Sequence, residues 1–238
     1  MADYHIGVIS HSRSQNVSSM EGVLSDKYSI TWYVGKNEGV DYKKEGAKYV
    51  VESGKLCESR NRLLEDAFKM DKTCIQLSDD LVSLRIAEDK KNTRESNMEE
   101  CISVIEQALN NTRMKLGGVN VAANAFYFDP LKPIKLRHFV LGDFSVIKPT
   151  DLRYDTRFKT KEDYDYTLQH IQKYGGVARC DSVIATFKHY NNIGGVVDSR
   201  TPEVEQKSIR LLKEKWGRNI VDNPRRPNEV LLRVKEGQ

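Results

Sequence analysis

The apolar residues of the chain fall into short runs that end in polar turns, a pattern typical of buried strands. In the first half of the chain, such runs predict strands at residues 4–10, 30–35, 47–51 and 73–77. In the second half they predict one or two strands within 134–147 and another at 181–190. The basic C-terminal tail, from residue 223 onward, is either an added strand or a charged arm.

Longer segments have apolar residues three and four positions apart, which is the helical period. This spacing predicts a helix over residues 58–70, with Ser59 as a candidate N-cap. It also predicts helices that follow residue 100 and that span 161–176 and 204–217. Residues 11–19 are predicted as a loop, residues 36–39 as a turn, and the glycine pair at 117–118 as a tight turn.

Strands that alternate with helical connections predict an α/β fold, in which a mixed, mainly parallel sheet is flanked by helices. Ligands of such sheets bind at the carboxyl ends of the strands. No stretch is rich enough in Pro, Gly and Ser to be a linker, and no internal repeat is present. We therefore expect a single domain over residues 1–238.

Composition and charge exclude several classes of protein. The net charge of +4 over 238 residues is too small for a polycationic nucleic-acid coat, although it permits a local basic face. The four cysteines form no Cys-x-x-Cys pair, which argues against a zinc ribbon and a secreted disulfide framework. No apolar run is long enough for a membrane span, and the N-terminus lacks the pattern of a signal peptide. We expect a cytoplasmic protein that does not bind membranes.

The segment CIQLSDDLVSL, residues 74–84, places Asp79 and Asp80 at the end of a predicted buried strand. Adjacent carboxylates repel one another and resist leaving water, so a compensating group is expected. A divalent cation is one such group, because Mg²⁺ and Mn²⁺ prefer hard oxygen ligands. The alternative is that the pair caps a following helix, since Asp is favoured at N-caps.

Two ordered motifs carry a resemblance to a known family. Residues 54–81, GKLCESRNRLLEDAFKMDKTCIQLSDDL, resemble the front half of the nucleotide-sugar glycosyltransferases with the Rossmann-like GT-A fold. Residues 139–181 resemble the family's later segment, in which a glycine-rich turn precedes a Glu-Asp pair and a helix ending in glycine. This chain departs from the family in having Ser-Asp-Asp as the acidic motif and Gly-Asp-Phe in place of Gly-Gly-Phe.

The resemblance implies that residues 1–90 bind a nucleotide sugar and that residues 91–238 bind the acceptor. It implies a Mn²⁺ or Mg²⁺ cofactor, with Asp80 as the direct ligand and Asp79 contacting the metal through water or holding the sugar and ribose. His189 is a further possible ligand, or a structural histidine. The other residues expected to contact the nucleotide sugar are Ser10, Arg13, Lys55, Arg60, Asn61 and Arg200. Arg60 and Asn61 are expected near a helix N-terminus, which attracts phosphates.

In the family, the Asp of the Glu-Asp motif removes a proton from the acceptor hydroxyl in inverting enzymes. That role corresponds to Asp163, with Glu162 binding the acceptor or orienting its partner. The alternative is that both acids only stabilise the first turn of a helix. Asp165, two residues further on, is expected to face solvent. Arg200 is expected to close over the diphosphate from a loop that contains Gly194 and Gly195.

The short length and the motifs SDDL, KEDYDYT and KWG most resemble the small phage and TET/JBP-associated glycosyltransferases. This implies transfer of a sugar, glucose or arabinose, from a UDP-sugar to 5-hydroxymethylcytosine in phage DNA, in the host cytoplasm. DNA requires positive charge beside the cleft, for which the candidates are Lys132, Lys135, Arg137, Arg153, Arg157, Lys159 and Lys161. The candidates for stacking on an exposed base are Phe126, Tyr127, Phe128 and Tyr154.

Two other functions remain open on the sequence. The first keeps the donor chemistry but transfers the sugar to a glycan or a protein. The second is a non-catalytic domain that binds DNA or a nucleotide. Replacement of Asp80 or Asp163 with Asn separates the second from an enzyme, because only an enzyme loses its activity. Oligomeric state is not readable from the sequence.

Overall fold

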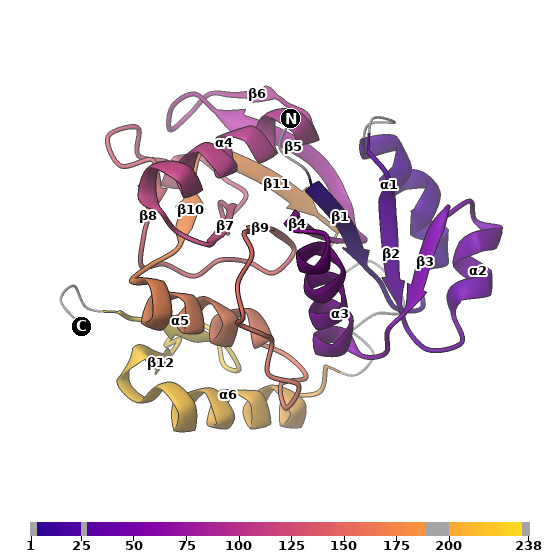
Figure 1. Ribbon diagram of the computed structural model, residues 1–238. Helices are drawn as coiled ribbons and strands as arrows, with labels where there is room; N and C mark the ends of the chain where they lie inside the picture. The colour runs from indigo at the N-terminus through magenta and orange to yellow at the C-terminus, as the bar shows by residue number, and fades with distance from the viewer. Residues whose placement is uncertain (1–3, 25–27, 189–199, 235–238) are drawn as a thin grey trace.

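The computed structural model describes residues 4–24, 28–188 and 200–234. Its first part is a parallel sheet in the spatial order β3-β2-β1-β4, with helices in the connections (Figure 1). The strands are β1 (Tyr4–Ile9), β2 (Ile30–Val34), β3 (Tyr49–Glu52) and β4 (Thr73–Ser78). The helices are α1 (Val17–Val23), α2 (Gly39–Lys44) and α3 (Leu56–Lys69), with the 3-10 turn η1 (Ser14–Asn16) before α1.

The same sheet continues beyond β4 in the order β9-β7-β10-β8, with both parallel and antiparallel pairings. These strands are β7 (Leu116–Val119), β8 (Ile134–Lys135), β9 (Phe144–Ile147) and β10 (Ala178–Cys180). Helix α4 (Met98–Thr112) leads into β7, and α5 (Glu162–Tyr174) leads into β10. The chain therefore has a mixed α/β architecture with a large, mainly parallel central sheet flanked by helices, as the alternation of elements predicts.

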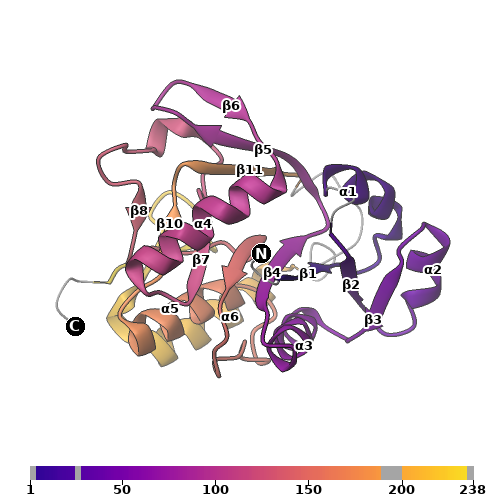
Figure 2. The same ribbon diagram turned by 45° about the horizontal axis from the view of Figure 1, so that its top comes forward.

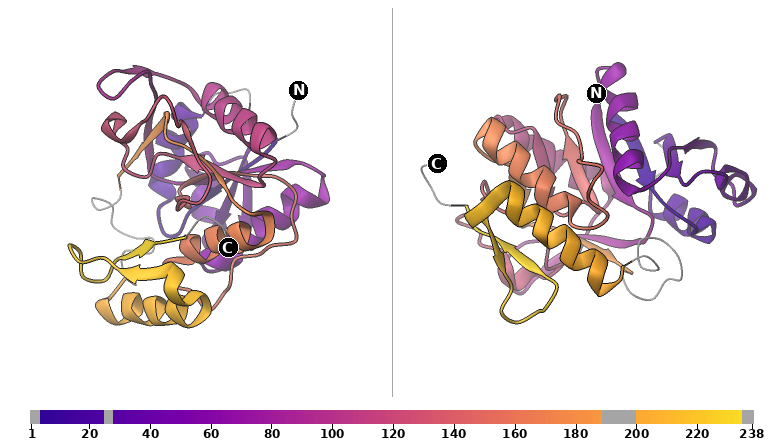
Figure 3. Two further views of the ribbon diagram at one scale, coloured as in Figure 1. Left: turned by 90° about the vertical axis from the view of Figure 1, so that its left-hand side faces the viewer. Right: turned by 90° about the horizontal axis from the view of Figure 1, so that it is seen from below.

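A second, antiparallel sheet of order β11-β5-β6 lies at the top of Figure 2. It consists of β5 (Leu81–Ala87), β6 (Thr93–Glu95) and β11 (Val183–Phe187). Near the C-terminus, α6 (Pro202–Trp216) is followed by the 3-10 turn η4 (Gly217–Asn219) and a hairpin of β12 (Ile220–Asp222) and β13 (Val230–Leu232). Figure 3 shows this hairpin beside α6. The described part of the tail thus contributes one strand, β13, which is one of the two predicted alternatives.

Alternation along the strands divides the core between the two faces of the large sheet. In β4, Ile75 and Leu77 join a cluster with residues of α1, α4 and the second sheet. Cys74, which precedes Ile75 and faces the other side of the sheet, joins a second cluster with residues of α3, α5 and α6. All four cysteines, Cys57, Cys74, Cys101 and Cys180, are free and buried. Within the described ranges, no helix is both long and apolar enough to cross a membrane.

The structure corrects several boundaries. Helix α1 begins within residues 11–19, which were predicted as a loop, and α2 was not predicted, because too few apolar residues mark their short buried faces. Helix α3 begins at Leu56, ahead of the predicted start, so Ser59 lies inside it and is not its N-cap. Gly117 and Gly118 lie within β7 and do not form a turn. A Cβ on Gly117 would lie 2.4 Å from Ile105 Cγ2, so this glycine allows α4 to pack closely on the strand.

Candidate functional site

Ser10 and Asp79 meet where two parallel strands end. Ile9, the last residue of β1, pairs with Ser78, the last residue of β4, so the next residue of each strand lies at the same sheet edge. The Ser10 hydroxyl is hydrogen-bonded to Asp79 Oδ2 and lies 2.5 Å from the hydroxyl of buried Tyr42. Both residues therefore lie at the carboxyl ends of their strands, where ligands of such sheets bind.

Arg13 completes this cluster from the loop after β1. Its Nη1 lies 3.2 Å from Asp79 Oδ1, and the two residues are only 7% and 3% exposed. Burial raises the pKa of Asp79, and the contacts with Ser10 and Arg13 oppose that rise. Both carboxylate oxygens of Asp79 thus have protein partners, which suits this residue to a fixed polar wall better than to direct metal coordination.

Asp80 lies in the two-residue turn between β4 and β5, and no helix follows it. The alternative in which the acidic pair caps a helix is therefore wrong. Asp80 is 7% exposed, and its carbonyl oxygen accepts a hydrogen bond of 3.0 Å from Lys188 N, just after β11. His189, the next residue, lies outside the described residues, as do Gly194 and Gly195.

Arg60 and Asn61 do not lie at the N-terminus of α3, where they were predicted to contact the nucleotide sugar. Because the helix begins at Leu56, Arg60 and Asn61 lie beyond its first turn. Asn61 uses its amide in two hydrogen bonds, 2.8 and 2.9 Å long, to the backbone N–H and carbonyl of Tyr154. This residue therefore holds the 154 segment against α3, while Lys55 is exposed at the N-cap position.

Arg60 is buried at the centre of the site. Its Nη2 lies 2.9 Å from Glu162 Oε1, and its Nη1 donates a hydrogen bond of 2.9 Å to the carbonyl of Gly142. Burial by itself lowers the pKa of the Arg60 guanidinium, but Glu162 and the neighbouring acids raise it to a net value above its usual range. Arg60 therefore stays charged and joins α3, the turn before β9 and the start of α5.

Asp163 lies beside this ion pair in the first turn of α5 and is half-buried. The N–H of Gly142 donates a hydrogen bond of 3.4 Å to its Oδ2. Burial, with the negative charges of Glu162 and Asp143, raises the pKa of Asp163 to about 7. A carboxyl group with this pKa exchanges a proton near neutral pH, which is the property required of a general base.

Asp143 lies between Asp79 and Asp163, and the sequence analysis did not select it as a site residue. Its carbonyl oxygen accepts a hydrogen bond of 2.8 Å from Ser78 N at the end of β4. Its charge contributes to the raised pKa values of both Asp79 and Asp163. The signal was present in the sequence, since this acid stands where the resembling family has the second glycine of Gly-Gly-Phe.

Arg200 lies just before α6, and Lys161 lies just before α5. Both Arg200 and Lys161 form ion pairs with Glu205 of α6, and Lys161 Nζ lies 2.6 Å from Glu205 Oε2. Lys161 adopts a left-handed backbone conformation, φ 63°, immediately before the Glu-Asp motif. Two cations that the sequence assigned to ligands thus also position the N-terminus of α5.

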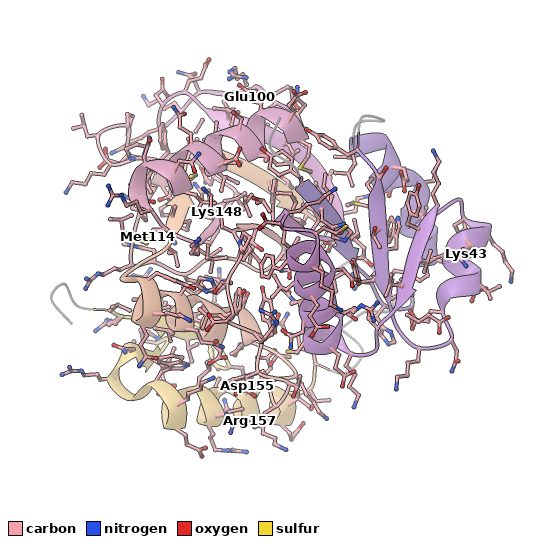
Figure 4. All side chains as sticks on the ribbon, viewed as in Figure 1. Lys43, Glu100, Met114, Lys148, Asp155 and Arg157 are labelled. Carbon is pink, nitrogen blue, oxygen red and sulfur yellow. The ribbon has the colours of Figure 1, made fainter. Side chains whose placement is uncertain are left out.

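Asp165 was expected to face solvent, and that prediction is wrong. Its side chain is completely buried and accepts hydrogen bonds of 2.7 Å from Trp216 Nε1 and from Gln169 Nε2. Lys215 Nζ lies 2.8 Å from its Oδ1 and also pairs with Asp155, which lies beside Arg157 near α6 (Figure 4). Asp165 therefore attaches α6 to α5.

The predicted acceptor-binding side chains divide into buried and exposed groups. Phe128 and Tyr154 are 6% and 3% exposed, so neither is available for stacking on a base. Phe126 and Tyr127 are 67% and 60% exposed. Among the cations, Lys161 is buried against Glu205, and the remaining candidates are Lys132, Lys135, Arg137, Arg153, Arg157 and Lys159.

No cluster of three or more His, Cys, Asp or Glu side chains capable of holding a metal occurs in the part of the chain that the structure describes. In nucleotide sites, Mg²⁺ is held by one or two carboxylates together with substrate phosphates. The position and burial of Asp80 fit such a ligand, whereas Asp79 is already bonded to Ser10 and Arg13.

Comparisons with known proteins give little further information. No family model matches the sequence, and no curated protein is similar to it. A solved structure of A197 from STIV aligns over 100% of both chains, with a TM-score of 0.44 and 11% sequence identity. A similarity of this size does not assign a function to this chain.

Proposed function

We propose that the chain is a metal-dependent glycosyltransferase of the GT-A type that uses a UDP-sugar as its donor. The observation that carries this proposal is that Asp79 and Asp163 lie on opposite sides of the turn that contains Gly142 and Asp143. Asp79 is bonded to Ser10 and Arg13 at the sheet edge, and Asp163 lies on the far side of Gly142 and Asp143. One group suits a nucleotide donor and the other suits an acceptor hydroxyl.

On the donor side, a diphosphate leaving group develops negative charge that requires compensation. A bound Mn²⁺ or Mg²⁺ supplies it by neutralising the phosphate oxygens. Asp80 is the residue proposed to hold the ion, together with the phosphates. Arg13 and Ser10 fix the Asp79 carboxylate, which we assign to the sugar or ribose hydroxyls of the donor.

On the acceptor side, an alcohol becomes a good nucleophile only when its proton is accepted in the transition state. We assign this role to Asp163, because its raised pKa of about 7 matches the demand on a base at neutral pH. Direct attack on the anomeric carbon then inverts its configuration. Glu162 is bonded to Arg60 and serves to fix the start of α5.

For the acceptor we propose 5-hydroxymethylcytosine or a related hydroxymethyl pyrimidine in DNA, with glucose or arabinose as the sugar. The support is the exposed aromatic pair Phe126 and Tyr127 with Lys132, Lys135 and Arg137 in the same part of the chain. A glycan or protein acceptor is the second candidate. It is favoured by the buried ion pair of Lys161, which removes one predicted cation from the DNA-binding face.

The test is transfer of labelled sugar from a panel of UDP-sugars to hydroxymethylated duplex DNA in the presence of Mn²⁺. We expect transfer by the wild type and none by Asp80→Asn or Asp163→Asn, with unchanged circular dichroism. Unmodified DNA and a glycan mixture are the acceptor controls. Transfer to the glycans alone supports the second candidate, and no transfer from any donor contradicts both.

A further inference from the structure

Three of the four most exposed large apolar side chains in the described residues belong to the connection between β7 and β8, residues 120–133. In it Phe126, Tyr127 and Leu131 are 67%, 60% and 91% exposed. The connection leads to β8, which forms one edge of the large sheet, while β3 forms the other (Figure 1). Neighbouring exposed apolar residues on a folded surface mark a contact site for another molecule.

This connection is held firmly to the second sheet. The Asn120 side chain is 2% exposed, donates to the carbonyls of Asp181 and Asn124, and accepts from Ala122 N. Buried Ala125 and Phe128 pack with Ile184 of β11. The exposed rings between them are therefore presented by a fixed backbone, and binding does not have to order the loop first.

The two exposed rings meet edge to face and are not stacked on one another. Their centroids lie 5.4 Å apart and their planes make an angle of 88°, so the edge of one meets the face of the other. The Asn124 side chain accepts a hydrogen bond of 2.9 Å from Phe126 N, which fixes the turn η2 (Ala125–Tyr127) that carries both rings. Each ring thus retains surface on which a planar group can stack.

Positive charge predominates in the segment that contains this connection. Residues 113–139 contain five of the chain's 38 lysines and arginines but only one of its 34 acidic residues, Asp129. The excess of positive charge in this segment equals the net charge of the whole chain, +4. Lysine is depleted at the core of protein–protein contacts, whereas aromatic rings among cations are typical of surfaces that bind single-stranded nucleic acid.

We propose that residues 120–137, the aromatic loop, form a binding surface for unpaired nucleic-acid bases. Phe126 and Tyr127 stack on the bases, and Lys132, Lys135 and Arg137 neutralise the phosphates. This inference rests on the proposed function for its choice of DNA and deepens it by naming the surface that holds the acceptor strand. Binding to that surface requires neither a donor nor a metal.

The test is fluorescence anisotropy of a labelled single-stranded oligonucleotide with the full chain, without UDP-sugar or Mn²⁺. We expect Phe126→Ala/Tyr127→Ala to weaken binding by about tenfold or more, since a base–aromatic stack contributes this much. Lys132→Glu/Lys135→Glu should weaken binding and reduce its salt dependence. Thermal unfolding of each variant should match the wild type, because all four side chains lie outside the core.

Tyr49→Ala is the matched control, because Tyr49 is 54% exposed on β3 at the opposite edge of the sheet. It should leave binding unchanged. The proposal is overturned by a wild type that does not bind the oligonucleotide, by aromatic variants that bind as well as the wild type, or by an equal loss in the control. Oligonucleotide binding without sugar transfer supports the surface while contradicting the proposed enzyme. Transfer with no contribution from the aromatic loop does the reverse.

Discussion

Arg60 and Glu162 form an ion pair of 2.9 Å in which each side chain is only 6% exposed. The pair joins the second turn of α3 to the first turn of α5. Removing one member leaves the other buried without its counter-charge, which costs about 3–5 kcal/mol. We expect Glu162→Gln and Arg60→Met each to lower the free energy of unfolding by this order. Urea denaturation measures it.

The double variant Arg60→Met/Glu162→Leu should lose less than the sum of the two single losses, because it leaves no unpaired charge. Single losses below about 1 kcal/mol, the value of an exposed pair, would show that the two side chains are solvated in solution.

Gly142 allows the Arg60 guanidinium to approach the backbone. A Cβ at this position would lie 2.2 Å from Arg60 Nη1. We therefore expect Gly142→Ala to displace the guanidinium, lower the melting temperature and reduce sugar transfer. Gly22→Ala is the control, since no atom lies within 4 Å of the added Cβ and Gly22 is in α1. It should be neutral or stabilising by up to about 1 kcal/mol. Equal effects of both substitutions would refute the packing argument.

The raised pKa of Asp163 predicts that the stability of the fold depends on pH. Its pKa is raised to about 7 in the folded chain, against about 3.9 for an unperturbed Asp. Between these values the folded state retains a proton that the unfolded state has released. The resulting contribution to stability is complete below about pH 4 and is lost as the pH rises through about 7.

Asp163→Asn should therefore flatten the decline in unfolding free energy over this pH range. The difference between the wild type and the variant isolates Asp163 from Asp79, whose pKa is also raised. Chemical denaturation at a series of pH values provides the measurement. Parallel curves for the two proteins would mean that Asp163 has an ordinary pKa.

Asp165 and Asp151 provide a contrast between a buried and an exposed carboxylate. Asp165 is completely buried and bonded to Trp216, Gln169 and Lys215. The Asp151 side chain pairs with Lys173 and is 74% exposed. We expect Asp165→Ala to lower the free energy of unfolding by about 3–5 kcal/mol and Asp151→Ala to lower it far less, because solvent screens an exposed pair. Similar losses in a denaturation experiment would argue against the burial of Asp165.

Asp80 and Ser10 should respond differently to metal. If Asp80 holds the ion with the phosphates, Mn²⁺ should raise the UDP affinity of the wild type by about tenfold or more. Asp80→Asn should abolish this gain. Ser10→Ala removes a hydrogen bond to Asp79 and should weaken UDP binding with or without Mn²⁺. Isothermal titration calorimetry distinguishes these results. An undiminished metal effect in Asp80→Asn would exclude it as the ligand.

The local pattern of apolar and polar residues was sufficient to predict most strands and helices. It was not sufficient to predict which groups surround a single side chain. The apolar run before Asp79 predicts β4 because a strand that is buried on both faces has apolar residues at successive positions. The alternation of its side chains between the two faces follows from strand geometry alone. Asp165 was misplaced because one helix in isolation shows only the spacing of its own side chains. The groups that bury this carboxylate, Lys215 and Trp216, belong to α6.

The sequence by itself determined the α/β class, the succession of most strands and helices, and the arrival of Ser10 and Asp79 at strand ends. These features depend on periodicity and on the parallel order of neighbouring strands, which short segments encode. Only the tertiary structure decided that Asn61 binds backbone, that Arg60 pairs with Glu162, and that Asp143 lies between two acidic groups. Each of these contacts joins segments far apart in the chain, and packing of the whole fold selects the partner.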